Sequence, residues 1–165
     1  MDSATLPIQS DYETERGKPM PSKLHSVITQ RLTVFLVNRY GDKFEILPEL
    51  TLDTPGERTT PDIAICEPEA IDFSKDEVKR KEPPLATIEI LSPTQILLTL
   101  LDKTNEYFSF GVKSCWVILP TLKTIYVYSA PYQFEVFSPG DEVFDAKLDI
   151  RLPIDTLFAP KSVGK

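Results

Sequence analysis

Two stretches, TPDIAICE at residues 60–67 and LATIEILSPTQILLTLLDK at residues 85–103, decide the fold and hold the candidate chemistry. Each contains a short apolar run rich in β-branched residues, which is typical of a buried strand. Asp62 lies at the start of the first predicted strand, and Glu89 lies inside the second. Buried carboxylates are costly unless they are paired or bound to a metal, so both residues are candidates for a functional site.

The rest of the sequence predicts an α+β (mixed α/β) domain around one sheet. A helix is expected over residues 22–40, because Ser22 can cap it and Gly41 follows it. A second helix is expected from Ser92–Pro93 to about Phe110. Alternating or continuous apolar residues predict further strands near residues 44–52, 113–120, 124–129, 133–138 and 147–153, the last followed by a turn of helix.

Domain boundaries follow from local composition. Residues 1–21 are polar and predict an irregular N-terminal arm that packs on the domain, residues 22–160 one domain, and residues 161–165 a disordered tail. Residues 67–84 carry mixed charge and three prolines, so we expect a surface loop there, with a helical turn at residues 75–81.

Composition restricts the class of protein. The chain has 165 residues, 41% of them hydrophobic, and a formal net charge of −7. A general nucleic-acid binder would usually be basic, but an acidic enzyme with a local basic patch remains compatible with this charge. Cys66 and Cys115 form no metal-ligand spacing. With no apolar run long enough for a membrane, we expect a cytoplasmic protein.

Asp62, Glu89 and Lys103 suggest a metal-dependent site. If the two strands are neighbours, the two carboxylates converge on one hard cation such as magnesium. In the simplest arrangement a lysine stands two residues after the glutamate, but Leu91 occupies that position, and Lys103 on the next helix is the substitute. The competing interpretation is that Asp62 caps a turn, Glu89 pairs with a basic side chain, and Lys103 is a solvated helix residue.

The chain resembles the Uma2 family of restriction-endonuclease-like proteins, which have the PD-(D/E)xK nuclease fold. The resemblance rests on these residues: Tyr12–Glu13 with Gly17, His25, Pro61–Asp62, Glu89–Pro93, Lys103 with Tyr107, Gly111–Val112, Trp116–Ile118 and Ile125–Tyr128. It implies a restriction endonuclease-like central mixed sheet flanked by helices, and an endonuclease that hydrolyses DNA with Mg²⁺ or Mn²⁺.

The resemblance also implies roles for individual residues. Asp62, Glu89 and Lys103 would be catalytic, with Asp62 and Glu89 as the metal ligands, and Glu13 and His25 would be accessory. The chain departs from the family in the apolar run at residues 95–101 and in Leu119–Pro120, which follows the tryptophan-containing strand. These departures, with the negative net charge, leave open a catalytically inactive relative that acts as a binding module.

The second predicted helix also suggests an oligomer. Ile96, Leu100 and Lys103 are expected to face the sheet, which leaves the side near Leu97, Leu98 and Leu101 in need of a cover. A homodimer would supply that cover. The alternative is that the N-terminal arm or the helix at residues 22–40 covers the same side within one chain.

Overall fold

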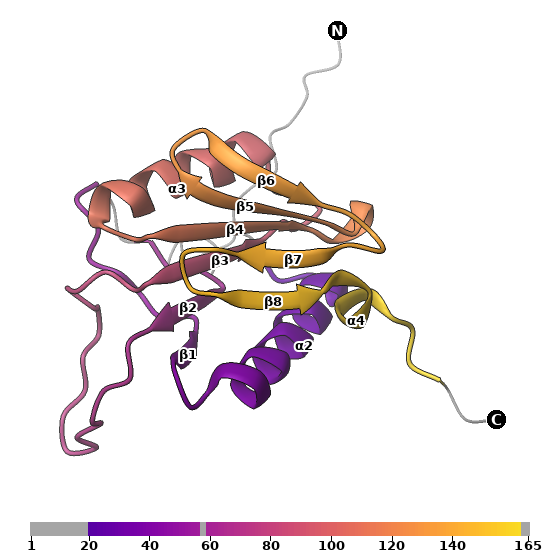
Figure 1. The fold of residues 1–165 in the computed structure, drawn as a ribbon. Helices are drawn as coiled ribbons and strands as arrows, with labels where there is room; N and C mark the ends of the chain where they lie inside the picture. Colours follow the sequence, from indigo (N-terminus) through magenta and orange to yellow (C-terminus); the bar gives the residue numbers. More distant parts are fainter. Residues whose placement is uncertain (1–19, 57–58, 163–165) are drawn as a thin grey trace, which may run out of the picture.

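The computed structural model describes residues 20–56 and 59–162, and its centre is a six-stranded mixed sheet in the order β1-β2-β3-β4-β5-β6 (Figure 1). The strands are β1 (Glu45–Pro48), β2 (Ile63–Cys66), β3 (Ala86–Ile90), β4 (Ser114–Leu119), β5 (Thr124–Ala130) and β6 (Gln133–Phe137). Among these, β3 and β4 are parallel and the other neighbours are antiparallel. The predicted α+β architecture is confirmed.

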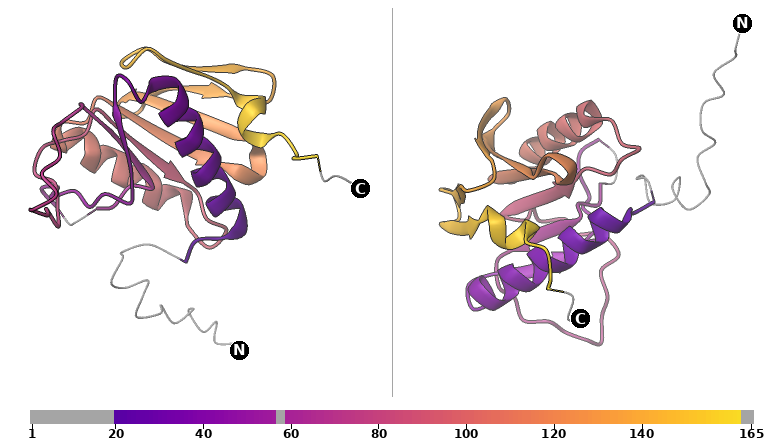
Figure 2. Two further views of the ribbon diagram at one scale, coloured as in Figure 1. Left: turned by 90° about the horizontal axis from the view of Figure 1, so that it is seen from below. Right: turned by 90° about the vertical axis from the view of Figure 1, so that its right-hand side faces the viewer.

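Helices cover both faces of the sheet. Helix α2 (Lys23–Tyr40) lies across one face and α3 (Leu97–Phe110) lies on the other (Figure 2). The hairpin β7 (Glu142–Asp145) with β8 (Ile150–Pro153) and the short helix α4 (Ile154–Phe158) join α2 on its side. A short 3-10 turn, η1 (Pro120–Leu122), links β4 to β5. The parallel pair β3–β4 is therefore buried on both faces, as its continuous apolar sequence requires.

Helix α2 begins and ends as its sequence predicts. The Ser22 hydroxyl accepts a hydrogen bond from the His25 backbone N–H, and the helix ends at Tyr40 before Gly41. Its core-facing row is Ile28, Leu32 and Leu36, spaced four residues apart on one side of the helix. This row fixes the rotation of α2 on the sheet, and His25 at the start of the helix is buried as a consequence.

Helix α3 begins later than the sequence suggests. The predicted start at Ser92–Pro93 is wrong, because the first helical residue is Leu97 and Ile96 is the N-cap. Residues 92–95 instead form a turn in which the Gln95 side chain accepts a hydrogen bond from the Ser92 N–H and so replaces a helical partner. The C-terminal end is as predicted, at Gly111 with φ of 114°.

The later start also changes which side chains of α3 face the sheet. Leu100 is fully buried as predicted, but Ile96 is 70% exposed and not on the sheet. Leu97 and Leu98 are exposed as expected, whereas Leu101 packs partly against the core. Ile96 is wrongly placed by the sequence because it precedes the first helical turn, so helical periodicity does not apply to it.

Two further predictions concern the segments on either side of β2. The helical turn expected at residues 75–81 is wrong, since this segment is irregular and Arg80 instead bridges to Leu52. Near residues 44–52 the sequence predicts one or two strands broken by Pro48, and β1 ends at Pro48, where Glu49 takes a left-handed conformation with φ of 57°. Most of the predicted N-terminal arm and tail (residues 1–19 and 163–165) lies outside the described residues. In the part of the chain that the structure describes, no helix is long and apolar enough to cross a membrane.

Candidate active site

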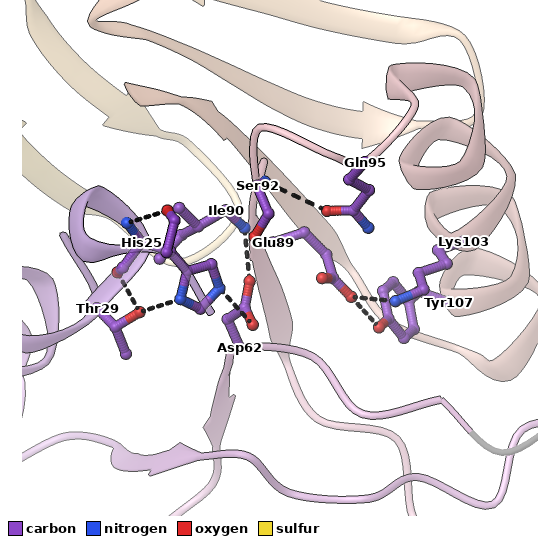
Figure 3. Close-up of polar contacts among 10 residues, drawn as sticks. His25, Thr29, Asp62, Glu89, Ile90, Ser92, Gln95, Lys103 and Tyr107 are labelled. Carbon is purple, nitrogen blue, oxygen red and sulfur yellow. Dashed lines mark hydrogen bonds and ion pairs between the residues drawn. The ribbon is translucent and has the colours of Figure 1, made fainter. Parts of the chain in front are cut away.

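Asp62 and Glu89 lie side by side at the ends of two neighbouring strands. In the antiparallel pair β2–β3, Ile63 lies opposite Ile88. Asp62 directly precedes β2 and Glu89 is next to the last residue of β3, so both lie at the same end of this strand pair (Figure 3). Both side chains are buried, with 1% and 2% exposure. The prediction that their strands are neighbours is confirmed.

The Asp62 carboxylate is held by the strand on one side and by α2 on the other. Its Oδ2 accepts a 2.7 Å hydrogen bond from the Ile90 backbone N–H, which extends the β2–β3 ladder beyond the end of β2. Its Oδ1 lies 3.0 Å from Nε2 of His25. A carboxylate that is ionised can only accept, so this contact requires the His25 proton on Nε2. The carboxylate orientation is thus fixed from both sides.

The Glu89 carboxylate is held by α3. Its Oε1 accepts a 2.5 Å hydrogen bond from the Tyr107 hydroxyl and lies 3.7 Å from Nζ of Lys103. Figure 3 shows Lys103 and Tyr107 approaching Glu89 from the helix while His25 approaches Asp62 from the opposite side. The Lys103 side chain is only 13% exposed, so its ammonium group belongs to the site and not to bulk solvent.

Burial determines the protonation of the neutral groups in the site. Burial raises the pKa of Tyr107 well above its ordinary value, and the negative charges of Glu89 and Asp62 add to that rise. Tyr107 therefore stays a protonated donor throughout the neutral range. Burial likewise raises the pKa of Cys115 to about 12 and that of Cys66 to about 11, so neither thiol is a nucleophile.

The structure brings four of the predicted site residues together. Asp62, Glu89 and Lys103 form the centre, and His25 touches Asp62 directly, which makes it more than a surface residue of the helix. Glu13 lies outside the described residues. The interpretation of Lys103 as a solvated helix residue is wrong, because its side chain is mostly buried and its ammonium lies 3.7 Å from Glu89.

Sequence reasoning gave no role to Tyr107 or to Thr29. Tyr107 follows Lys103 by four residues and so lies on the same face of α3. Thr29 follows His25 by four residues, and its hydroxyl donates to the His25 carbonyl and lies 3.5 Å from Nδ1. A residue four positions after a candidate site residue lies on the same face of the helix, and this spacing is the sequence signal for both Tyr107 and Thr29.

The donor set suits a magnesium-type cation held partly by water and substrate. Carboxylate oxygens are the preferred ligands of Mg²⁺, which typically takes one or two carboxylates and completes its shell with water and phosphate oxygens. Asp62 and Glu89 supply two such groups. Within residues 20–56 and 59–162, no three His, Cys, Asp or Glu side chains form a complete metal cage by themselves. Two carboxylates alone would leave the rest of such a cation's shell to water and substrate oxygens.

Comparison with known proteins identifies a family and a similar fold. The Uma2 family model, described as "Putative restriction endonuclease", matches residues 11–155. A solved structure from Anabaena variabilis, described as "a putative nuclease belonging to DUF820", has a similar fold with a TM-score of 0.74. It is 25% identical in sequence, and the match covers 86% of this chain and 83% of the other. None of the curated proteins matches the chain.

Proposed function

This chain belongs to the Uma2 family, and from that premise we propose that it is a magnesium- or manganese-dependent DNA endonuclease. The observation that carries the proposal is the pair of buried carboxylates, Asp62 and Glu89, beside the partly buried Lys103. His25 and Lys103 each contact one of these carboxylates, and the pair still supplies the oxygen ligands that Mg²⁺ prefers. A phosphodiester-cleaving site uses this arrangement.

The proposed roles follow from the contacts of each side chain. Asp62 and Glu89 would hold the cation, which when bound lowers the pKa of a water ligand and neutralises charge on the scissile phosphate. His25 orients Asp62 through the 3.0 Å contact, and Tyr107 orients Glu89 through its hydroxyl. Lys103 adds a fixed positive charge where negative charge grows in the transition state.

The experiment is cleavage of DNA with manganese, both as a duplex plasmid and as a single strand, comparing the wild-type chain with Glu89→Ala. We expect cleavage products from the wild type and none from the variant. A thermal-shift measurement with millimolar magnesium or manganese accompanies it, because a cation that binds the folded chain raises its melting temperature by mass action. The absence of both cleavage and a metal-dependent shift in the wild type would contradict the proposal.

A binding module without catalysis is the second candidate function. It is favoured by the net charge of −7 and by the exposed apolar start of α3, where Ile96 and Leu98 are 70% and 64% exposed. This candidate predicts no cleavage and no metal-dependent shift. The same two measurements therefore separate the two functions.

We also propose that the chain forms a homodimer through the start of α3. Ile96, Leu97 and Leu98 make three consecutive exposed apolar side chains at the N-terminal end of the helix. A two-fold pairing of this surface would bury it against itself.

A further inference from the structure

Helix α2 carries positive charge in an acidic protein. Its sequence, KLHSVITQRLTVFLVNRY, contains Lys23, Arg31 and Arg39 and neither Asp nor Glu, although the whole chain has 25 acidic residues. The helix also supplies His25 to the candidate active site. The most basic helix of the structure described is thus the one that borders the site.

Two hollows lie on either side of α2. The first, of about 440 Å³, faces β1 and is lined by His25 and Glu49. The second, of about 520 Å³, faces α4 and is lined by Arg31, Arg39 and Lys161. Gln30 and Val34 line both hollows and form the ridge between them. Figure 2 shows α4 lying beside α2.

The second hollow has a cationic rim and an apolar floor. None of its described lining residues is acidic. Arg31 donates to the carbonyls of Leu157 and Ala159 and so fixes the wall made by α4. Among the described residues, neither Arg39 nor Lys161 has an acidic partner, and both are exposed. These two cations are available to an anionic ligand.

We propose that an unpaired nucleic-acid strand crosses α2 between the two hollows, with one phosphate at the Asp62–Glu89 site and another at Arg39 and Lys161. The cations match the phosphates of such a strand. Its exposed bases suit the apolar floor at Val34 and Phe35, and the Gln30 and Asn38 amides can pair with base edges. This inference rests on the proposed nuclease function and names its substrate as single-stranded.

A duplex fits this surface less well than a single strand. Its bases are stacked inside and unavailable to an apolar hollow, so it would use the phosphate contacts only. Along the helix axis, His25 and Arg39 are separated by about 21 Å, which several nucleotides of an extended strand can span. The strand would therefore contact both the site and the cationic rim at once.

The test measures binding by fluorescence anisotropy on the full chain in EDTA, so that cleavage plays no part. The probe is a labelled DNA strand of about 16 nucleotides, compared with the same sequence as a duplex. The Arg39→Gln, Lys161→Gln variant should bind the single strand about tenfold more weakly. Its affinity should also depend less steeply on salt, with the slope of log K against log salt smaller by about 0.7 for the one phosphate contact that is lost.

The matched control is Lys113→Gln, Lys147→Gln, which removes the same charge from exposed positions outside both hollows. This variant should keep wild-type affinity. The inference would be overturned if both variants lost the same affinity for the single strand, or if the Arg39→Gln, Lys161→Gln variant kept wild-type affinity. Tighter binding of the duplex than of the single strand would also overturn it. Circular dichroism of both variants checks that each is folded.

The binding test also separates this inference from the proposed function. A wild-type chain that binds the single strand in EDTA but never cleaves with manganese overturns the nuclease function and supports the strand path across α2. A chain that cleaves, but whose Arg39→Gln, Lys161→Gln variant binds and cleaves like wild type, overturns the strand path alone.

Discussion

The Tyr107 hydroxyl lies 2.5 Å from Oε1 of Glu89, and the tyrosine side chain has no exposed surface. The hydrogen bond connects α3 to the middle of the sheet at the proposed metal ligand. Since burial raises the pKa of Tyr107 well above its ordinary value, the hydroxyl donates rather than ionises at any pH used for the reaction. The tyrosine is a positioning residue for Glu89.

Replacing Tyr107 with Phe should weaken the proposed activity without unfolding the chain. The ring remains to fill the core, while Glu89 loses the donor that fixes one of its oxygens. Loss of such a partner typically costs 10–100-fold in metal affinity or activity. We therefore expect cleavage to need more manganese for half-maximal rate. A variant with an unchanged metal dependence would show that the hydroxyl serves packing alone.

The pH dependence of cleavage gives a second measurement on the same pair. Because the pKa of Tyr107 is raised, its deprotonation cannot cause any loss of activity below pH 10, its ordinary value. Any alkaline loss below that pH should be the same in wild type and in Tyr107→Phe. A loss of activity below pH 10 that occurs in wild type and is missing in Tyr107→Phe would contradict this assignment.

Lys103→Ala should abolish cleavage and leave metal binding nearly intact. The Lys103 ammonium lies 3.7 Å from Glu89 Oε1, so it is near the proposed ligand without belonging to the donor set of a cation. Its positive charge would act mainly on charge developed in the transition state. The checks are plasmid cleavage and the manganese-induced change in melting temperature. Wild-type cleavage by the variant would remove Lys103 from the mechanism.

Sequence alone predicted the centre of the site because its residues lie in or beside strongly patterned elements. The apolar runs around Asp62 and Glu89 are short and continuous, which gave two buried strands and two buried carboxylates. The i, i+4 spacing from Lys103 pointed to Tyr107 but not to its hydrogen bond with Glu89, because that bond depends on how α3 is rotated against the sheet. Ser92–Pro93 looks like a helix start, but α3 begins at Leu97, after a turn in which the Gln95 side chain accepts a hydrogen bond from the Ser92 N–H.

Asp145 provides a stability prediction away from the site. This buried carboxylate on β7 accepts hydrogen bonds from the Ser114 hydroxyl and the Trp116 indole N–H, so it ties the β7–β8 hairpin to β4. Asp145→Ala would leave both buried donors without a partner. We expect the free energy of unfolding to fall by about 3 kcal/mol in urea titrations.

The control for Asp145 lies on the same hairpin. Glu142 pairs with Arg151 at 3.1 Å, but both side chains are about half exposed. Glu142→Ala should therefore lower the free energy of unfolding by less than about 1 kcal/mol. Similar losses in the two variants would mean that the Asp145 network contributes no more than a surface ion pair.

The last prediction concerns the proposed dimer. The sequence predicts Leu97, Leu98 and Leu101 on the side of α3 that faces away from the sheet, but Leu101 packs partly against the core. Ile96 takes its place, with 70% of its side chain exposed. The variant that tests the interface is therefore Ile96→Glu, Leu98→Glu, because both positions are exposed and a charge there should not disturb the core.

Light scattering at micromolar concentration should give twice the chain mass of 18.7 kDa for wild type and the monomer mass for this variant. Val136→Glu is the matched control, since Val136 is an exposed apolar residue on the edge strand β6, away from the start of α3. It should leave the dimer intact. A wild-type mass near 18.7 kDa would rule out self-association, and the exposed start of α3 would then need a different partner, as the binding-module function requires.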